Sequence, residues 1–180
     1  ETIYYLSSDL DLDLDSNGVL DDVDGDVTYE ALESAVNWAS DSETLVVYLV
    51  DHGGNGKFRM SGEKTLSVEE LDSLLDSLQE NASCKVIVVY DACESGSFIS
   101  NMQLPSGQER IILTSTSPHE PANFLTQGSI SFSDFFWTHV FNGVNVKDAF
   151  ELASTSMSSY QTAMIDANGN GVGNEQEDKD

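Results

Sequence analysis

The sequence predicts an α/β domain of three layers, in which a mainly parallel β-sheet is flanked by helices. Two continuous apolar runs, Thr44–Val50 and residues 86–90, are mostly β-branched, as expected for strands that are buried on both faces of a parallel sheet. Between them, Val68–Asn81 has leucines at helical spacing. A strand, a helix and a strand in so short a span form a right-handed crossover, which makes the two strands parallel.

The remaining elements follow from local patterns. Thr28 is a suitable helix N-cap, and Glu30 and Glu33 in the first turn suit the helix dipole. Aromatic residues at helical spacing, such as Phe136 and Phe150, indicate two helices in the C-terminal half. The other expected elements, in chain order, are a strand at 2–6, a helix at 28–39, a hairpin at 57–66, a strand at 110–115 and helices at 133–141 and 146–160.

Length and charge limit the domain organisation and the partners. At 180 residues the chain is long enough for one domain with its own core, which we assign to residues 1–160, followed by an acidic tail at 161–180. The 32 acidic and 7 basic residues give a net charge of -25. This charge excludes nucleic-acid binding, which depends on Lys and Arg, and it favours bound cations. No apolar run is long enough to insert into a membrane, and we expect the chain to be part of a larger one.

The two cysteines have different expected roles. Cys84 and Cys93 are placed at opposite ends of one strand, too far apart for a disulfide. We expect Cys84 to be an inert buried thiol. Cys93 follows the strand among small residues, which allow a sharp turn and a close approach to a ligand. The carboxyl edge of a parallel sheet is also where open α/β folds bind their ligands.

His52 is the expected partner of Cys93. It follows the strand Thr44–Val50 by two residues, so the imidazole and the thiol are expected to face each other across one cleft. A thiol nucleophile needs a base and an oxyanion site, and the backbone N–H groups of Gly53 and Cys93 are suitable donors because Gly53 has no side chain to block the approach. His119, in a Pro-containing loop, and His139, on a helix, are alternative bases; for His139 we expect a structural role.

These residues carry a family resemblance. The motifs Val47-Tyr-Leu-Val-Asp-His-Gly53 and Tyr90-Asp-Ala-Cys-Glu-Ser-Gly-Ser-Phe98 resemble those of the legumain family of cysteine endopeptidases, in the caspase-like clan. The resemblance implies a caspase-like fold, with His52 as the base, Cys93 as the nucleophile, and the amides of Gly53 and Cys93 as the oxyanion site. The family's first strand and helix have no counterpart in this sequence, and the acidic loop at residues 9–26 is not a feature of the animal and plant enzymes.

The resemblance also implies a substrate pocket. Its wall would include Glu94, Ser115, Thr116 and Asp134. An acidic pocket suits the amide of Asn or the cation of Arg or Lys, and it opposes Asp and Glu.

Two acidic loops match the calcium-loop pattern, which has oxygen ligands at positions 1, 3, 5, 9 and 12, a backbone carbonyl at 7 and glycine at 6. Residues 166–177 fit it in full, and residues 13–24 fit it with Asp at the last position. Both loops offer only oxygen ligands, which excludes zinc. The alternative to a calcium site is, for each loop, a solvated acidic loop with turn glycines. In the first loop the expected ligands are Asp13, Asp15, Asn17, Val19 (carbonyl), Asp21 and Asp24, and coordination could be shared by Asp9, Asp11, Asp22 and Asp26. In the second loop the expected ligands are Asp166, Asn168, Asn170, Val172 (carbonyl), Asn174 and Glu177.

The resulting functional prediction is a cysteine endopeptidase that cleaves peptide or protein substrates through a thioester, after Asn or a basic residue. It needs no organic cofactor and has Ca²⁺ in a structural role. The calcium loops and the acidity predict an exported or cell-surface protein. The alternatives are a calcium-stabilised, non-catalytic binding or adhesion module with a peptidase-like fold, and a thiol acyltransferase that uses the same site.

Overall fold

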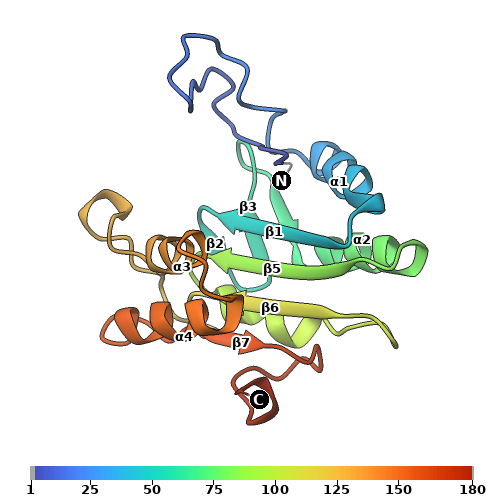
Figure 1. Cartoon of the computed structure of the whole chain (residues 1–180), viewed down its shortest axis with the longest axis vertical. Coiled ribbons are helices and arrows are strands. Elements are labelled where there is room, and N and C mark those ends of the chain that lie inside the picture. The colour runs from blue at the N-terminus through green and yellow to red at the C-terminus, as the bar shows by residue number, and fades with distance from the viewer. Residues whose placement is uncertain (1–2, 180) are drawn as a thin grey trace.

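The computed structural model describes residues 3–179, and its main sheet has the strand order β1-β5-β6-β7 (Figure 1). These strands are β1 (Thr44–Val50), β5 (Lys85–Asp91), β6 (Arg110–Thr114) and β7 (Met164–Asp166). The first three run parallel to one another, and β7 runs antiparallel to β6. The predicted mainly parallel sheet is therefore confirmed.

A smaller antiparallel sheet lies beside the carboxyl end of β1. It consists of β2 (Gly53–Gly54), β3 (Lys57–Arg59) and β4 (Thr65–Ser67), in that order. The pairing of β3 with β4 confirms the predicted hairpin. The added strand β2 directs the chain that follows His52 toward the edge of the main sheet.

Helices cover both faces of the main sheet. Helix α1 (Tyr29–Trp38) and helix α2 (Val68–Asn81) lie on one face, and α3 (Phe132–Phe141) and α4 (Val146–Met157) lie on the other (Figure 1). Thr28 caps α1 as predicted, because its hydroxyl accepts a hydrogen bond from the Ala31 N–H. Short 3-10 helices occupy Ala39–Asp41, Ser95–Asn101, Thr126–Gly128 and Glu177–Lys179.

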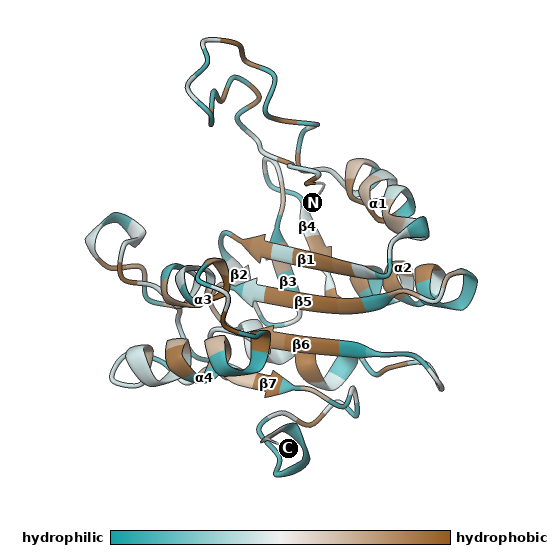
Figure 2. Ribbon diagram, viewed as in Figure 1, coloured by the Kyte–Doolittle hydropathy of each residue, from teal (hydrophilic) through white to brown (hydrophobic). Residues whose placement is uncertain are grey.

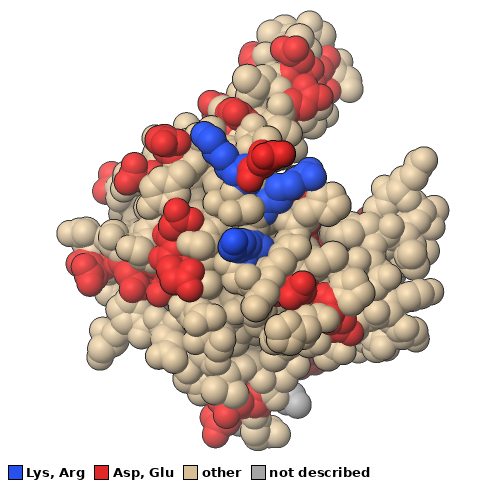
Figure 3. Space-filling view, turned by 180° about the vertical axis from the view of Figure 1, so that it is seen from behind, with Lys and Arg blue, Asp and Glu red and all other residues tan. Residues whose placement is uncertain are grey.

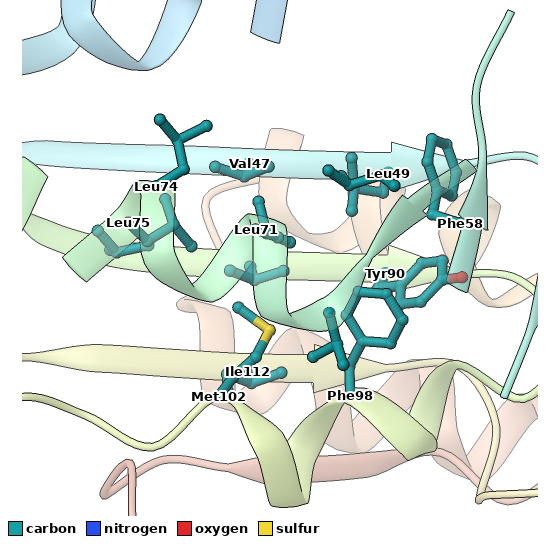
Figure 4. Packing of buried hydrophobic residues seen from close by; sticks show 14 of the residues in the cluster. Val47, Leu49, Phe58, Leu71, Leu74, Leu75, Tyr90, Phe98, Met102 and Ile112 are labelled. Atoms are coloured by element: carbon teal, nitrogen blue, oxygen red, sulfur yellow. The ribbon is translucent and has the colours of Figure 1, made fainter. Parts of the chain in front are cut away.

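The core on the α2 face joins both sheets. Leu71 and Leu75 of α2 lie over β1 and β5 (Figure 4), and both side chains are fully buried. Tyr90, at the end of β5, makes edge contacts with Phe58 and Phe98. Its hydroxyl donates a hydrogen bond to the Lys57 carbonyl at 2.9 Å, which ties β3 to the end of β5.

The core on the other face is rich in aromatic side chains. Phe132 and Phe136 of α3 stack on each other, and Phe132 also packs against Phe150 of α4. Figure 2 shows the continuous apolar character of the central strands, as expected for strands that are covered on both sides. Among the described residues, no helix is long and apolar enough to cross a bilayer.

Two expectations are wrong. Apart from Thr2, which lies outside the described residues, the segment predicted as a strand at 2–6 contributes only an isolated bridge between Leu6 and Gly25, because neither sheet pairs with it. The tail expected at 161–180 is partly integral to the domain, since β7 lies in it and pairs with β6. Ala163 and Ile165 from this segment are buried in the aromatic core.

The acidic loop at residues 9–26 projects away from the body of the protein (Figure 1). Acidic side chains are spread over the surface that is seen from behind, with few basic ones among them (Figure 3). One basic side chain is not at the surface: Arg110 is buried and bonds to Asp72 and Asp76 of α2, each at 2.7 Å.

Candidate functional site

The site is built where β1 and β5 end. The parallel register pairs Val50 with Asp91, so the two strands end side by side. The segment His52-Gly53 and the residue Cys93 therefore follow directly at the same edge, as the sequence predicts.

Gly53 touches the turn that carries Cys93. A Cβ at Gly53 would lie 2.5 Å from the Tyr90 hydroxyl and 2.8 Å from the Ala92 Cβ, and nearer still to the Cys93 carbonyl oxygen. No side chain fits there, so this approach requires glycine.

The backbone amide of Gly53 is not used by the small sheet. The Arg59 N–H donates to the His52 carbonyl at 2.9 Å, and Gly53 is opposite Phe58. In an antiparallel ladder this is the pattern of a non-hydrogen-bonded pair, in which the N–H of Gly53 points away from β3. The His52 side chain is exposed, and its backbone N–H donates to the Asp51 carboxylate at 2.5 Å.

Cys93 is partly exposed, and its sulfur accepts a hydrogen bond from a neighbouring loop. Its side chain is half-buried, whereas Cys84 is buried, with 1% of its surface exposed. The Sγ of Cys93 accepts a hydrogen bond from the Ala122 N–H at 3.4 Å. The next residue, Glu94, has a φ of 58°, which is uncommon outside glycine and produces the sharp turn after the strand.

Side chains from the end of β6 brace this turn from behind. The Thr116 hydroxyl accepts from the Ser95 N–H at 3.0 Å, and the Ser95 hydroxyl accepts from the Thr116 N–H at 3.1 Å. Ser115 and Thr116, for which the resemblance implies contact with substrate, have no exposed surface. In this arrangement both residues are packed behind the turn that carries Cys93.

The other two residues of the implied pocket lie at separate places. Asp134 is exposed and lines a groove of about 420 Å³ together with Tyr48, Val50 and Trp137. Glu94 is absent from the lining of this groove, and its carboxylate lies 3.5 Å from the His119 imidazole, which is largely exposed. His139, the third histidine, lies in the last turn of α3.

A buried carboxyl, Asp91, was not singled out by the sequence patterns. Its Oδ2 accepts hydrogen bonds from the Ser133 N–H at 2.9 Å and from the Ser133 hydroxyl at 2.6 Å, which ties the end of β5 to the first turn of α3. Within the described residues, its Oδ1 has no hydrogen-bond partner. Burial raises the pKa of Asp91 above its ordinary value, although the bonds from Ser133 oppose this shift.

The first acidic loop gathers carboxylates, but in part not the expected ones. Oxygen atoms of Asp13, Asp15 and Asp22 lie within 4.8 Å of one another. Asp22 lies outside the ligand positions of the loop pattern and was expected only as an additional ligand, whereas the expected ligand Asp21 is not part of the cluster. The expected ligand Asp24 instead accepts from the Tyr5 N–H at 2.7 Å. The side chain of Asn17 bonds to Asp15, and its Oδ1 accepts from the Val19 N–H.

The second acidic loop is closed by its own backbone. Both oxygens of Asp166 accept from amides of the loop, including that of Gly171 at 2.8 Å. Burial raises the pKa of Asp166, these bonds oppose the shift, and the nearby Asp178 adds to it. Asn174 is engaged with the Ile165 N–H and with the Ala163 carbonyl.

The remaining expected ligands of the second loop differ in their surroundings. The Asn168 Oδ1 accepts from the Asn170 N–H, and the Asn170 Oδ1 from the Val172 N–H. Glu177 is exposed, whereas its neighbour Asp178, which the pattern did not include, is buried and accepts from the Ala167 N–H.

Comparison with known proteins agrees with this architecture. Among solved structures, the chain is similar to caspase-1 from Spodoptera frugiperda, with a TM-score of 0.61 and 13% identity over 81% of this chain and 70% of that one. This likeness shows a caspase-like fold. No sequence among the curated proteins matches. The model of the peptidase C13 family matches residues 19–168, a span that includes His52 and Cys93 and most of the domain, so this chain belongs to the peptidase C13 family, the legumain family of cysteine peptidases.

Proposed function

We propose that this protein is a cysteine endopeptidase in which Cys93 is the nucleophile and His52 is the general base. The observation that carries the proposal is the register of β1 with β5, which sets His52-Gly53 beside the Cys93 turn with room for glycine only. Family membership supports peptidase activity in general.

The chemistry follows from the two side chains. The Cys93 sulfur attacks the carbonyl carbon of the scissile bond while His52 accepts the thiol proton. The tetrahedral intermediate carries its negative charge on oxygen, where the N–H groups of Gly53 and Cys93 donate to it. Its collapse expels the amine, which takes the proton from His52 and leaves a thioester on Cys93. Water, activated by His52, then hydrolyses the thioester.

The preferred substrate residue is Asn, Arg or Lys. The groove beside β1 combines the exposed carboxylate of Asp134 with the aromatic rings of Tyr48 and Trp137. A carboxylate next to aromatic faces suits a cationic side chain, which can pair with the carboxylate and make a cation–π contact with a ring. It also suits an amide, which can donate a hydrogen bond to the carboxylate. Glu94 adds a second negative charge at the turn after the nucleophile.

Calcium binding to the acidic loops is part of the same proposal. The clustered carboxylates of Asp13, Asp15 and Asp22 are the hard oxygen ligands that Ca²⁺ prefers. In the second loop, Asp166 and Asp178 are two buried carboxyls whose charges oppose each other, and a cation would relieve this repulsion. The location of the protein outside the cell or at its surface stays a prediction.

The test is hydrolysis of fluorogenic peptides that end in Asn, Asp, Arg, Lys or Ala, with calcium present. Cleavage after one class of residue, lost in Cys93→Ala and in His52→Ala, is the expected result. Cys84→Ala is the matched control, since it removes the other thiol, which is buried at the far end of β5. A substrate-like thiol-reactive probe should label Cys93 in the folded protein and spare Cys84. If a folded, calcium-loaded sample cleaves nothing and is not labelled, the proposal fails in favour of a non-catalytic binding module.

A further inference from the structure

We propose that Gln161 and Glu120 are positioning residues that hold the loop at residues 117–123 against Cys93, so that the Ala122 N–H remains directed at the catalytic sulfur. This inference rests on the proposed function, because it gives these residues a role in catalysis only if Cys93 is the nucleophile. It adds a third segment, far from both motifs in the sequence, to the groups that set the geometry of the reaction.

Two backbone hydrogen bonds join the loop to the nucleophile turn. The Ala122 N–H donates to the Cys93 Sγ at 3.4 Å, and the Glu94 N–H donates to the Glu120 carbonyl at 2.8 Å. One bond reaches the sulfur itself, and the other holds the residue that follows Cys93. A donor held at the sulfur restricts the direction of its lone pairs, and it stabilises the negative charge that develops when the thiol loses its proton.

The side-chain amide of Gln161 closes this loop. Gln161 is buried, with 3% of its surface exposed. Its Nε2 donates to the Ser115 carbonyl at 2.9 Å, and its Oε1 accepts from the Asn123 N–H at 2.7 Å. One amide thus connects Ser115, which precedes the loop directly after β6, to Asn123, which follows Ala122.

Glu120 forms a second connection to the same place. Its Oε2 accepts from the Ser117 N–H at 3.0 Å, from the Ser117 hydroxyl at 2.8 Å and from the Thr162 N–H at 3.0 Å. Burial raises the pKa of Glu120, but the bonds from Ser117 and Thr162 together outweigh it, and the pKa lies below its ordinary value. The carboxylate is therefore ionised at neutral pH, and the loop is fixed to residues 161–162, between α4 and β7.

The position of the sulfur relative to its donor consequently depends on contacts outside both motif segments. Gln161 is buried, and its side-chain hydrogen bonds join Asn123 and Ser115, neither of which belongs to the two motifs. If these bonds are removed, the loop is expected to move away from Cys93 while the strands and the groove at Asp134 stay in place. The effect should then appear in the chemical step and much less in substrate binding.

The experiment compares acylation of Cys93 by an irreversible substrate-like probe in the wild-type protein and in Gln161→Met. Methionine keeps the volume of the side chain and removes both hydrogen bonds. We expect the maximal acylation rate to fall by at least about ten-fold, since misplacement of a reacting group by about 1 Å can cost a hundred-fold. The probe concentration for half-maximal rate should change by less than about three-fold.

Two further variants separate positioning from general damage. Gln108→Met is the matched control, because Gln108 also anchors a loop, by donating to the Gln79 carbonyl at 2.7 Å, but at the opposite end of the sheet. Its acylation rate should equal that of the wild type. In Gln161→Glu, a protonated carboxyl can again donate to the Ser115 carbonyl, so the ratio of its rate to the wild-type rate should rise as the pH is lowered from about 7 to 5.

The outcomes distinguish this inference from the proposed function. If the probe labels folded Gln161→Met as fast as the wild-type protein, the positioning role is refuted and the peptidase proposal stands. The same holds if the maximal acylation rate falls as far in Gln108→Met as in Gln161→Met. If the probe does not label the wild-type protein above Cys93→Ala, both proposals fail together. Should Gln161→Met not fold, Glu120→Gln replaces it: an unchanged maximal rate in that variant refutes the positioning role.

Discussion

Replacing Gly53 by alanine should damage the site, because the added methyl group has no room. The added Cβ would lie 2.5 Å from the Tyr90 hydroxyl and 2.8 Å from the Ala92 Cβ, with the Cys93 carbonyl oxygen nearer still. Two of these neighbours belong to the turn that carries Cys93, and Tyr90 is fixed by its hydrogen bond to the Lys57 carbonyl. None of the three can withdraw as the free end of a flexible side chain can, so the segment of Gly53 itself must move.

The size of the effect can be worked out from this crowding. Forcing an extra methyl group into a closely packed position costs about 1–3 kcal/mol. For a domain of this size, each kcal/mol lowers the melting temperature by about 2–4 °C. The same movement would displace the Gly53 N–H from the proposed oxyanion site, and the loss of one oxyanion donor lowers kcat by about a hundred- to a thousand-fold.

Gly54→Ala is the matched control, because a Cβ at Gly54 meets nothing within 4 Å. Thermal unfolding and peptide hydrolysis are measured for wild type, Gly53→Ala and Gly54→Ala. Gly54→Ala should keep both the stability and the activity of the wild type. A Gly53→Ala variant that is as stable and as active as Gly54→Ala would refute the close approach of Gly53 to Cys93 and its role as oxyanion donor.

Three further predictions concern stability. Arg110→Met should lower the free energy of unfolding in urea by about 1–3 kcal/mol, because the buried Gln79 Oε1 loses the donors that Arg110 supplies, whereas the Asp72 carboxylate is partly exposed and can bond to water. A loss below about 1 kcal/mol would contradict this. Burial raises the pKa of Asp91 in the folded protein above its unfolded value of about 3.9. The stabilisation that the protonated carboxyl provides is therefore complete below the unfolded pKa, and it is lost as the pH rises through the folded pKa. The stability of Asp91→Asn relative to wild type should therefore increase from pH 4 to pH 7, and a difference that is independent of pH in urea unfolding would exclude this. Calcium at a hundred times its dissociation constant should stabilise the protein by about 2.7 kcal/mol, and the resulting rise in melting temperature should shrink in Asp13→Asn but persist in Asp41→Asn.

Much of the fold was predictable because its signals are local. Two long β-branched runs and an amphipathic helix between them predict parallel strands, and parallel strands that are neighbours end at the same edge of a sheet. The placement of His52, Gly53 and Cys93 at one edge follows from that topology and from the counting of residues after each strand. The cap Thr28 is also local, since the capping bond spans only three residues.

The tertiary structure decided which polar side chains face one another, and here local patterns fail. Loop spacing predicted Asp21 and Asp24 as ligands, but the path of the chain brings Asp22 beside Asp13 and sends Asp24 to the Tyr5 amide. A segment expected to be an acidic tail supplies β7, because the pairing partner of a strand is set by contacts that no periodicity records.

The contacts that support the Cys93 turn depend on tertiary structure for the same reason. Thr116 lies behind the Cys93 turn, Asp91 reaches the first turn of α3, and Gln161 closes the loop that carries Ala122. In the sequence, Thr116 and Gln161 lie far from Cys93 and no spacing relates them to it. Asp91 lies close to Cys93 in the sequence, but no local pattern shows that its carboxylate is directed at α3. Apolar periodicity specifies which face of an element is buried, whereas a hydrogen bond between distant side chains needs both partners at a distance of about 3 Å, which only the complete packing of the chain determines.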